Sequence, residues 1–502
     1  MSTQAIETRL FINGEFVQSI KGKRFPVTNP SNGEHVADVS EADQDDVDKA
    51  VQAASAAFPA WENTDRTFTA FTRSKILLKL ADLVEANVPE FARLEALSMG
   101  RPVATYDDAI IATFIIRYAA SAVHQISGKT SIQSPGTFSM SLKQPYGALS
   151  GQPRRLNVGI EAELSRVNGL PVIMLATKAS YCLAAGNTLV LKSSEKAPLT
   201  SCLFAKLTTE AGLPGGVFNL VHGFGLPCGN AIAARPNIRK ISFTGSPGTG
   251  KLIARAAAES NFKNVTLELG GKNPIVVFDD ADLDKAAKAA VTSGFFNAGQ
   301  LCMASSRVLL QDTIKDQFME AYLAHVDELA SKQGDPLHAE TLLGPQADEA
   351  QWSNITSIID KGKKAGLNFV RGADQRPSPR NGCFINPAVV LEPSQDEPIV
   401  RNEVFGPVTA VNSFSTAEQA LEMMNNSEYG LYASVFTKDV ARALKFSKRV
   451  ESGVVAINRT SPLLAFDLPF GGYKMSGSGR EFGSEGLETW LETKTVIFDG
   501  PA

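Results

Sequence analysis

The sequence predicts an α/β protein, in which the strands of a largely parallel sheet alternate with helices. From Pro171 onwards, short apolar runs bounded by glycine and proline alternate with longer segments whose apolar residues recur at helical spacing. The length of 502 residues exceeds what one ordinary hydrophobic core organises, so two or three domains are expected. A composition of 43% hydrophobic and 20% charged residues is typical of a soluble globular protein.

The first 126 residues are expected to hold two small β units followed by a helical flank. Residues 10–17 read as a hairpin, because Asn13-Gly14 between apolar residues favours a tight turn with positive φ. Residues 26–39 read as a strand, a turn and a second strand. Four segments then repeat apolar residues at helical spacing, with charged residues on the intervening faces. These predicted helices are 47–61, 68–85, 88–98 and 106–126.

The middle of the chain reads as alternating strands and helices. The expected strands are 188–192, 217–221, 238–243 and 265–269, and the expected helices are 198–211 and one that begins near Lys251. Between residues 243 and 251, a glycine-rich connection joins a strand to a helix. Such a connection can present backbone N–H groups and a helix dipole to a phosphate, although it is not the usual Gly-x-Gly-x-x-Gly fingerprint.

A second α/β unit is expected after residue 269. Asp279-Asp280 is expected to cap a helix over 283–295, and residues 487–498 alternate like a half-buried strand. Further predicted strands are 274–278, 307–310, 367–370 and 453–458, and further predicted helices are 314–331 and 346–365.

Charge and hydropathy exclude two classes of partner. The net charge of −4 provides no broad basic field, so no nucleic-acid partner is expected. No membrane span is expected, because the most apolar candidate, residues 169–191, is interrupted by Lys178. The first ten residues lack a basic start followed by an apolar stretch, and the last five carry no peroxisomal address. We therefore expect a cytoplasmic protein.

The cysteines and histidines indicate neither a disulfide framework nor a metal site. The five cysteines are odd in number and widely scattered, and the five histidines are equally dispersed. No Cys/His cluster has metal-ligand spacing, so catalysis without a metal is expected.

Two reactive side chains stand out in residues 264–307. Glu268 ends an apolar run that Gly270-Gly271 must terminate, and Cys302 lies in a polar turn before the next predicted strand. A thiol in such a turn is held by a rigid scaffold without being part of a ladder. Taken alone, however, a cysteine is most often an inert buried residue and a glutamate a solvated charge.

The two residues gain weight from their surroundings. Glu-Leu-Gly-Gly-Lys (268–272), followed by Gly-Gln-Leu-Cys (299–302), resembles the paired active-site signatures of the aldehyde dehydrogenase superfamily. The resemblance covers nearly the whole chain and includes Phe-Ile-Asn-Gly-Glu (11–15) and Asn-Pro-Ser-Asn-Gly-Glu (29–34). It implies a Rossmann-like NAD-binding domain, an α/β catalytic domain and a small β oligomerisation element. The expected boundaries are 1–127 and 151–268, then 269–460, and finally 128–150 and 485–502.

The resemblance also implies NAD as the cofactor. Phe-Thr-Gly-Ser (243–246), with Gly250 four residues later, looks like the stretch that binds NAD(P) in this superfamily, which assigns Gly245, Ser246 and Gly250 to the cofactor. Leu269 is expected to contact the cofactor as well.

Four more residues match cofactor contacts of the family. Lys192 and Glu195 match those that hold the adenosine ribose, and a carboxylate at Glu195 would repel a 2′-phosphate, which favours NAD over NADP. Glu403 and Phe405, in Glu-Val-Phe-Gly-Pro, resemble the nicotinamide-ribose clamp.

The implied chemistry is covalent. A Cys302 thiolate would add to an aldehyde, hydride would pass to the cofactor, and Glu268 would help water to hydrolyse the resulting thioester to a carboxylic acid. Because a free thiol is mostly protonated at neutral pH, the site must lower its pKa or supply a base. In the family, the position of Glu481 is a candidate proton relay.

The oxyanion of this reaction needs donors, and the resemblance implies the side-chain amide of an asparagine that follows a Pro-Tyr-Gly strand, here residues 145–147. The best match to that asparagine is Asn168, with Asn157 as a weaker candidate. About a dozen more residues than usual precede Asn168, within Gly151 to Arg166. Three explanations compete: a tolerated surface loop, a lineage-specific change of the active site, or a translated intron. We favour the last, because charged residues in a normally buried segment are costly.

Other functions stay open at this point. One is an acylating relative that transfers the acyl group to phosphate or coenzyme A, and another is a catalytically impaired homologue with a binding or structural role. Retention of Glu268 argues against the former, since hydrolysis requires that base. The apolar side chains of Phe295, Phe296, Leu301, Met303 and Phe470 suggest an apolar substrate tunnel. A terminal strand able to pair with another chain favours a homo-oligomer, either a dimer or a tetramer.

Overall fold

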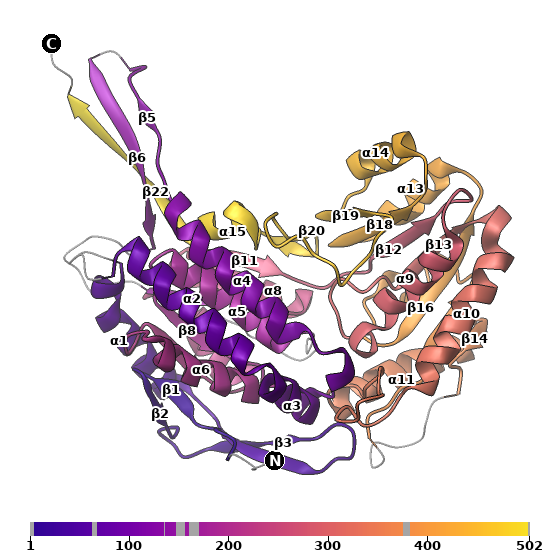
Figure 1. Ribbon diagram of the computed structural model, residues 1–502, viewed down its shortest axis with the longest axis horizontal. Coiled ribbons are helices and arrows are strands. Elements are labelled where there is room, and N and C mark those ends of the chain that lie inside the picture. The colour runs from indigo at the N-terminus through magenta and orange to yellow at the C-terminus, as the bar shows by residue number, and fades with distance from the viewer. Residues whose placement is uncertain are drawn as a thin grey trace.

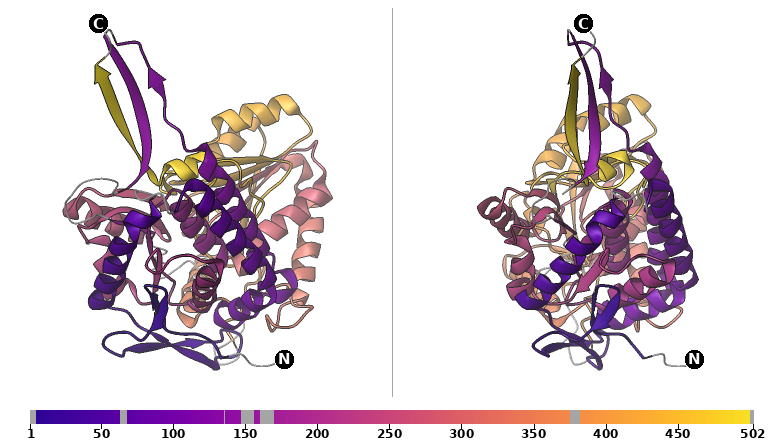
Figure 2. Two further views of the ribbon diagram at one scale, coloured as in Figure 1. Left: turned by 60° about the vertical axis from the view of Figure 1, so that its left-hand side comes forward. Right: turned by 90° about the vertical axis from the view of Figure 1, so that its left-hand side faces the viewer.

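The computed structural model describes residues 5–62, 68–134, 136–146, 170–374 and 382–499, together with the backbone of 156–159. Its chain forms two α/β bodies and a β arm that projects away from both (Figures 1 and 2). The first body and the arm comprise β1 (Leu10–Ile12), β2 (Glu15–Val17), β3 (Arg24–Thr28), β4 (His35–Ser40), α1 (Gln44–Trp61), α2 (Ala70–Ala86), α3 (Val88–Met99), α4 (Asp108–Ala122), β5 (Thr130–Ser131), β6 (Thr137–Pro145), β7 (Leu156–Gly159), α5 (Pro171–Ala184), β8 (Leu189–Lys192), α6 (Leu199–Ala211), β9 (Phe218–Val221), α7 (Asn230–Ala233), β10 (Ile238–Thr244), α8 (Pro247–Ser260) and β11 (Asn264–Glu268).

The second body follows in the sequence. It comprises β12 (Pro274–Val277), α9 (Leu283–Phe295), the short helix η4 (Phe296–Gly299), β13 (Arg307–Gln311), α10 (Lys315–Ser331), α11 (Glu349–Lys364), β14 (Phe369–Arg371), β15 (Ala388–Leu391), α12 (Pro398–Arg401), β16 (Val408–Phe414), α13 (Ala417–Asn425), β17 (Tyr429–Gly430), β18 (Tyr432–Phe436), α14 (Val440–Arg449) and β19 (Val454–Ile457). The chain then returns through β20 (Tyr473–Lys474), β21 (Gly477–Ser478) and α15 (Gly483–Glu488) to β22 (Leu491–Asp499) in the arm.

The strands of the first body form two four-stranded groups that lie side by side. Their orders are β2-β1-β9-β8 and β21-β11-β10-β7, and β7 packs beside β8. The pairs β8–β9, β7–β10 and β10–β11 are parallel, as the alternation of strands and helices predicted.

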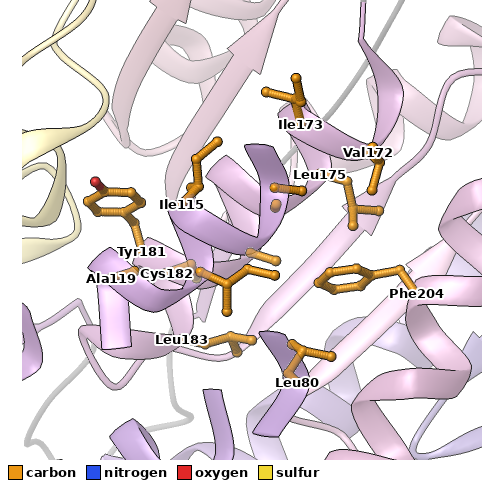
Figure 3. Packing of buried hydrophobic residues seen from close by; sticks show 14 of the residues in the cluster. Leu80, Ile115, Ala119, Val172, Ile173, Leu175, Tyr181, Cys182, Leu183 and Phe204 are labelled. Atoms are coloured by element: carbon orange, nitrogen blue, oxygen red, sulfur yellow. The ribbon is translucent and has the colours of Figure 1, made fainter. Parts of the chain in front are cut away.

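Alternating residues of β8 face two different cores. Leu189 and Leu191 lie in a cluster with α2, α4, α5 and α6, whereas Val190 lies in a cluster with α1 and α8. Figure 3 shows side chains of the first cluster, including Leu80, Ile115, Leu175 and Phe204, gathered between these helices. Helices therefore cover both faces of this sheet, which explains why its strands are apolar throughout.

The second body is built around a seven-stranded sheet of order β14-β15-β16-β13-β12-β18-β19. All pairs are parallel except β14–β15. Val308 and Leu310 face the cluster that contains α9 and α10, while Leu309 faces the cluster that contains α13 and α14. This sheet is also covered on both sides.

The arm is the antiparallel sheet β22-β6-β5, in which β6 and β22 pair from Leu491–Pro145 to Asp499–Thr137. It extends well beyond the two bodies in every view (Figures 1 and 2).

Three predicted details are wrong. The cap of α9 is Asp282, which accepts from Lys285 N at 3.2 Å, because the helix starts at Leu283 and the cap residue must immediately precede it. Helix α8 begins at Pro247 rather than near Lys251, since Ser246 caps it and proline suits the first helical position. Residues 483–488 form α15, so the last strand starts at Leu491 rather than at Leu487.

Within the described ranges, every helix is too short or too polar to cross a bilayer. In the same part of the chain, no three His, Cys, Asp or Glu side chains gather closely enough to hold a metal ion.

Candidate active site

Glu268 is the last residue of β11 and lies at the edge where the parallel strands of this group end. Pairing with β10 places it opposite Thr244, and its carbonyl accepts from Gly245 N at 3.0 Å. Only 2% of its surface is exposed. The end of the strand thus brings the carboxylate and the glycine-rich turn together.

Cys302 follows α9 and the short helix η4, in the turn before β13. The segment η4 is a left-handed turn rather than an ordinary helix, because Asn297, Ala298 and Gly299 have positive φ values of 49°, 56° and 74°. The Cys302 side chain is partly exposed, unlike those of the other four cysteines, which are buried. It is thus the accessible thiol of the chain, as expected for a nucleophile.

The structure brings Glu268 and Cys302 together, as predicted. Burial raises the pKa of Glu268 to about 8, with the negative charge of Glu481 as the next cause, while interaction with the Cys302 thiol acts in the opposite direction. Burial also raises the pKa of the Cys302 thiol, and the neighbouring Glu268 raises it further. Neither carboxylate oxygen of Glu268 has a hydrogen bond of ordinary geometry among the described residues. The two side chains therefore lie close enough to shift each other's pKa, and burial disfavours the charged form of both.

A buried ion pair lies close to this carboxylate. Lys178, on α5, pairs with Glu481, and both side chains are nearly inaccessible to solvent. Ser242 Oγ lies 3.5 Å from Glu481 Oε1. Glu481 and Lys178 also act on the pKa of Glu268 in opposite directions, so the ion pair lies within electrostatic reach of the strand end.

An apolar cavity of about 810 Å³, including its open mouth, reaches the thiol. Its walls come from both bodies and from the segment after β19. The lining residues are Arg101, Thr105, Asp107, Asp108, Ile111, Leu170, Ile173, Met174, Thr244, Phe296, Leu301, Cys302, Met303, Pro462, Leu464, Phe466, Phe470 and Phe482. Of the five residues predicted to line a tunnel, Phe295 is the exception, because it packs beneath the seven-stranded sheet.

Arg101 is the cationic group in this wall, and it is already neutralised. Its guanidinium donates to both oxygens of Asp108 at 3.0 Å and also to Thr105 Oγ1 and O. The guanidinium carbon also lies 4.6 Å from the centre of the Phe296 ring. A bidentate pair of this kind leaves little positive charge for a second carboxylate on a substrate.

The glycine-rich turn caps α8 and borders a second cavity. Ser246 Oγ accepts from Thr249 N at 3.3 Å. A Cβ atom added at Gly250 would lie 2.9 Å from the Leu269 side chain, so this glycine lets the helix approach the end of β11. The cavity is lined by Phe224, Gly225, Leu226, Gly229, Asn230, Ala233, Thr249, Leu252, Ile253, Arg255, Ala256 and Glu259.

Lys192 and Glu195 lie just beyond the end of β8. Lys192 Nζ donates to Ser193 O at 2.9 Å and lies 3.5 Å from Glu195 Oε2. Lys192 is fully buried. The pair therefore sits at the same edge of the strands as the glycine-rich turn, where open α/β sheets bind ligands.

Glu403 and Phe405 reach the site from the loop before β16. Glu403 Oε1 accepts from Gly271 N at 3.1 Å, and its charge contributes to the raised pKa values of Glu268 and Cys302. Phe405 has a φ of 55° and its carbonyl accepts from Gln351 Nε2 at 2.7 Å. Glu403 thus lies within electrostatic reach of the reactive pair, whereas Phe405 is held through its backbone by Gln351 of α11.

The predicted oxyanion donor, Asn168, lies outside the described residues. Asn157 lies on β7, whose backbone pairs with β10. Part of the surplus segment therefore continues the sheet of the first body.

Comparison with known proteins decides the family. The model of the aldehyde dehydrogenase family matches residues 16–152 and 158–496 of this chain. The chain belongs to the aldehyde dehydrogenase family. The interruption of the match, at residues 153–157, falls in the segment that the sequence marked as surplus.

Individual relatives cover almost all of this aldehyde dehydrogenase. Aldehyde dehydrogenase family 2 member C4 of Arabidopsis thaliana is 38% identical over 496 residues, covering 98% of this chain and 94% of the plant protein. The NAD⁺ complex of aldehyde dehydrogenase from Bacillus cereus is 37% identical, with a TM-score of 0.91 and coverage of 98% and 96%. An indole-3-acetaldehyde dehydrogenase mutant of P. syringae, in complex with NAD⁺ and IAA, is 31% identical, with a TM-score of 0.92 and coverage of 99% and 97%.

Sequence reasoning missed several residues around the candidate site. Lys178 was noted as an interruption of an apolar run, and a charged residue inside so apolar a helix is the signal that could have indicated a buried partner. Arg101 and Asp108 carry no such signal, because Arg101 follows the end of one helix and Asp108 begins the next. The apolar wall of the second cavity, including Leu226 and Leu252, was also missed.

Proposed function

We propose that this aldehyde dehydrogenase oxidises an aldehyde to a carboxylic acid with NAD, through a covalent intermediate on Cys302. The observation that carries the proposal is the meeting of the Cys302 thiol and the Glu268 carboxylate at the end of an apolar cavity, beside the glycine-rich turn. The NAD complexes of similar structures support the choice of cofactor.

The thiol of Cys302 is the nucleophile. After losing its proton to a base, its sulfur adds to the aldehyde carbon and forms a hemithioacetal. Bound NAD would supply the acceptor for the hydride that leaves this carbon. A thioester to Cys302 remains, and water hydrolyses it to release the acid and the free thiol.

Glu268 is the base that activates this water. A carboxylate with a pKa of about 8 is a far better proton acceptor than an ordinary glutamate, once it is ionised. Burial raises the pKa of both Glu268 and Cys302. Cys302 must therefore lose its proton before it adds to the aldehyde, and Glu268 must lose its proton before it accepts one from water. Glu481 and Lys178 adjoin Glu268, so we propose that Glu481 relays this proton.

The cofactor would lie across the ends of β8, β10 and β11. Gly245, Ser246 and Gly250 would present the start of α8 to its phosphates, and the cavity beside α8 would take an apolar ring face. The fit is supported by the close approach of α8 that Gly250 permits.

Lys192 and Glu195 would hold the adenosine ribose. The Glu195 carboxylate can accept from both ribose hydroxyls and would repel a 2′-phosphate, which favours NAD over NADP. Glu403 would accept from the nicotinamide ribose, while Phe405 and Leu269 would pack beside it.

The substrate would be an aldehyde with an apolar body. Aromatic and aliphatic side chains dominate the cavity that Cys302 helps to line, and the Arg101 guanidinium is neutralised by Asp108. A dicarboxylic semialdehyde is disfavoured for the same reason. Asn168 stays our proposed amide donor to the oxyanion.

We also propose the domain division 1–127 with 151–268, 269–460, and 128–150 with 485–502, the last as the element through which a homo-oligomer forms. Apolar side chains on the projecting arm support this role. Ile132, Phe138, Ile497 and Phe498 are 76%, 40%, 67% and 45% exposed.

Formation of NADH with a panel of aliphatic and aromatic aldehydes tests the proposed activity. Cys302→Ala is expected to abolish turnover, whereas Cys383→Ala, which removes a buried thiol, should retain it. Turnover by the Cys302→Ala protein, or none by the wild type with any aldehyde, would overturn the proposal.

A further inference from the structure

The backbone just before Cys302 is held in an unfavourable conformation. Asn297, Ala298 and Gly299 are three successive left-handed residues, with φ values of 49°, 56° and 74°. Glycine and, to a lesser extent, asparagine adopt this conformation readily, but alanine does not, because its Cβ crowds the following carbonyl. Something outside the turn must therefore stabilise Ala298 in this state.

A glutamine from a distant loop contacts this alanine. Gln346 lies in the loop before α11 and is 0% exposed. Its Nε2 donates to Ala298 O at 3.0 Å, across 48 residues of sequence, and its own backbone N donates to Cys383 O at 2.8 Å. The side-chain amide thus holds the carbonyl of the strained residue from a fixed backbone position.

A second glutamine makes the reverse connection. Gln300, also fully buried, accepts from Ala347 N at 2.9 Å and donates to Asn297 O at 3.0 Å. It also lies within 3.3 Å of Pro345 O. The loop 344–347 and the turn 297–300 are therefore joined in both directions by buried amides.

The loop itself has little freedom to move. A Cβ atom added at Gly344 would lie 2.0 Å from Gly100 O, and one added at Gly100 would lie 2.5 Å from Pro345 Cγ. Arg101, the next residue, lines the cavity that reaches the thiol. The loop is thus packed between the cavity wall and the turn that carries Cys302.

The side-chain amide of Gln346 uses its donor but not its acceptor. Its Oε1 is buried and has no hydrogen-bond partner in the described part of the chain. An unpaired buried acceptor is destabilising, so an apolar side chain would suit this position better if packing were its only role. The donor, rather than the volume, is what the amide provides here.

We propose that Gln346 is a positioning residue for the nucleophile. By donating to Ala298 O it stabilises the left-handed turn, and the turn presents the Cys302 sulfur to the cavity and to Glu268. The inference rests on the proposed function, since it assumes that Cys302 is the nucleophile.

Gln346→Met tests this role, because methionine has a similar shape and no donor. With iodoacetamide as the probe, the rate constant for alkylation of Cys302 is expected to fall about 10- to 100-fold, together with the first-turnover formation of NADH. The dissociation constant for NAD is expected to change less than about 2-fold, since the amide touches only the turn.

A rescue separates positioning from general damage. In the Gln346→Met background, Ala298→Gly should restore much of the alkylation rate, because glycine adopts a positive φ without support. Asn412→Leu is the matched control. Asn412 lies on β16, and its buried side-chain amide donates to Pro393 O at 2.7 Å. Loss of this hydrogen bond should leave the rate of alkylation unchanged. Should Gln346→Met not fold, Gln346→Leu, which also lacks a donor, is expected to show the same loss and the same rescue.

Two results would overturn the inference. One is wild-type alkylation and NADH formation by Gln346→Met, and the other is a loss that Ala298→Gly does not restore. Failure of the proposed function would instead appear in the wild type, as an unreactive Cys302 and no NADH with any aldehyde.

Discussion

Glu268 and Cys302 are two weak acids whose side chains are neighbours in the candidate site. Their proximity determines how the rate of each proposed step depends on pH. Burial raises the pKa of both groups, and the Glu268 carboxylate raises the pKa of the Cys302 thiol further, whereas interaction with the thiol lowers the pKa of Glu268. Burial therefore disfavours the charged form of both groups, and each step of the proposed reaction needs one of them to lose its proton.

The release of acid is expected to rise with pH. Glu268 accepts a proton only when it is ionised, so the rate of thioester hydrolysis should increase through its pKa of about 8 and level off above it. Steady-state and first-turnover rates, measured from about pH 6 to about pH 10, separate this step from the formation of the thioester.

Glu268→Gln removes the base without changing its size. The rate of hydrolysis is expected to fall about 100- to 10,000-fold and to lose its dependence on pH near 8. Glu320→Gln, on the exposed face of α10, is the control and should leave the profile unchanged. An unaltered profile in Glu268→Gln would show that another group supplies the base.

At this scale, the sequence predicts a reactive pair, whose catalytic roles stay a proposal, but not the residues packed around it. Glu268 and Cys302 lie in short signatures, which is why the sequence predicts them. Gln346, Lys178 and the pair Arg101–Asp108 act through contacts between distant segments, and nothing local distinguishes such a glutamine or lysine from an ordinary one.

Among the elements, α8 shows how a single glycine positions a binding surface. The helix begins against the end of β11, and the Leu269 side chain fills the space beside Gly250. The start of the helix, with its capping Ser246, is therefore fixed relative to Glu268.

Gly250→Ala is expected to push α8 away from Leu269. The added Cβ would meet Leu269 Cδ2 at 2.9 Å, so the affinity for NAD should fall several-fold and the midpoint of thermal unfolding should decrease. Gly248→Ala is a control in the same helical turn, since nothing lies within 4 Å of a Cβ at that position. Calorimetric titration with NAD measures the affinities, and equal affinities in the two variants would refute this account of the turn.

Most helices and strands could be predicted because their apolar periodicity matches the core that they face. The errors lie at helix boundaries, where the capping residue determines the first residue of the helix. Asp282, rather than Asp279-Asp280, caps α9, and α8 begins at Pro247, earlier than expected. Asp280 instead accepts from Lys438 N and Asp439 N, a contact with a strand end about 160 residues away that no local pattern indicates.

For the whole molecule, the arm stands out because it projects from both bodies and exposes apolar side chains that no other described part of the chain covers. Its antiparallel strands join residues 137–145 to residues 491–499, and Phe138 packs against Phe498 with ring centres 5.9 Å apart. The sequence suggested a terminal strand but not its partner, because the pairing spans most of the chain.

Charged residues on the arm are expected to weaken assembly. Ile497→Asp together with Phe498→Asp should shift the protein toward monomers, since an exposed apolar surface on a projecting sheet is stabilised by burial against another copy. Sedimentation velocity measures the change, and Phe71→Asp, which alters an equally exposed residue on α2, serves as the control. If the protein with both arm substitutions sedimented like the wild type, this surface would be excluded as the interface.

The central claim is that Cys302 carries the acyl group and Glu268 releases it. Intact-protein and peptide mass spectrometry of Glu268→Gln, mixed with an aldehyde and NAD, tests both parts at once. We predict that the protein gains the mass of one acyl group, on the peptide that contains Cys302. No adduct, or an adduct on another residue, would contradict the account.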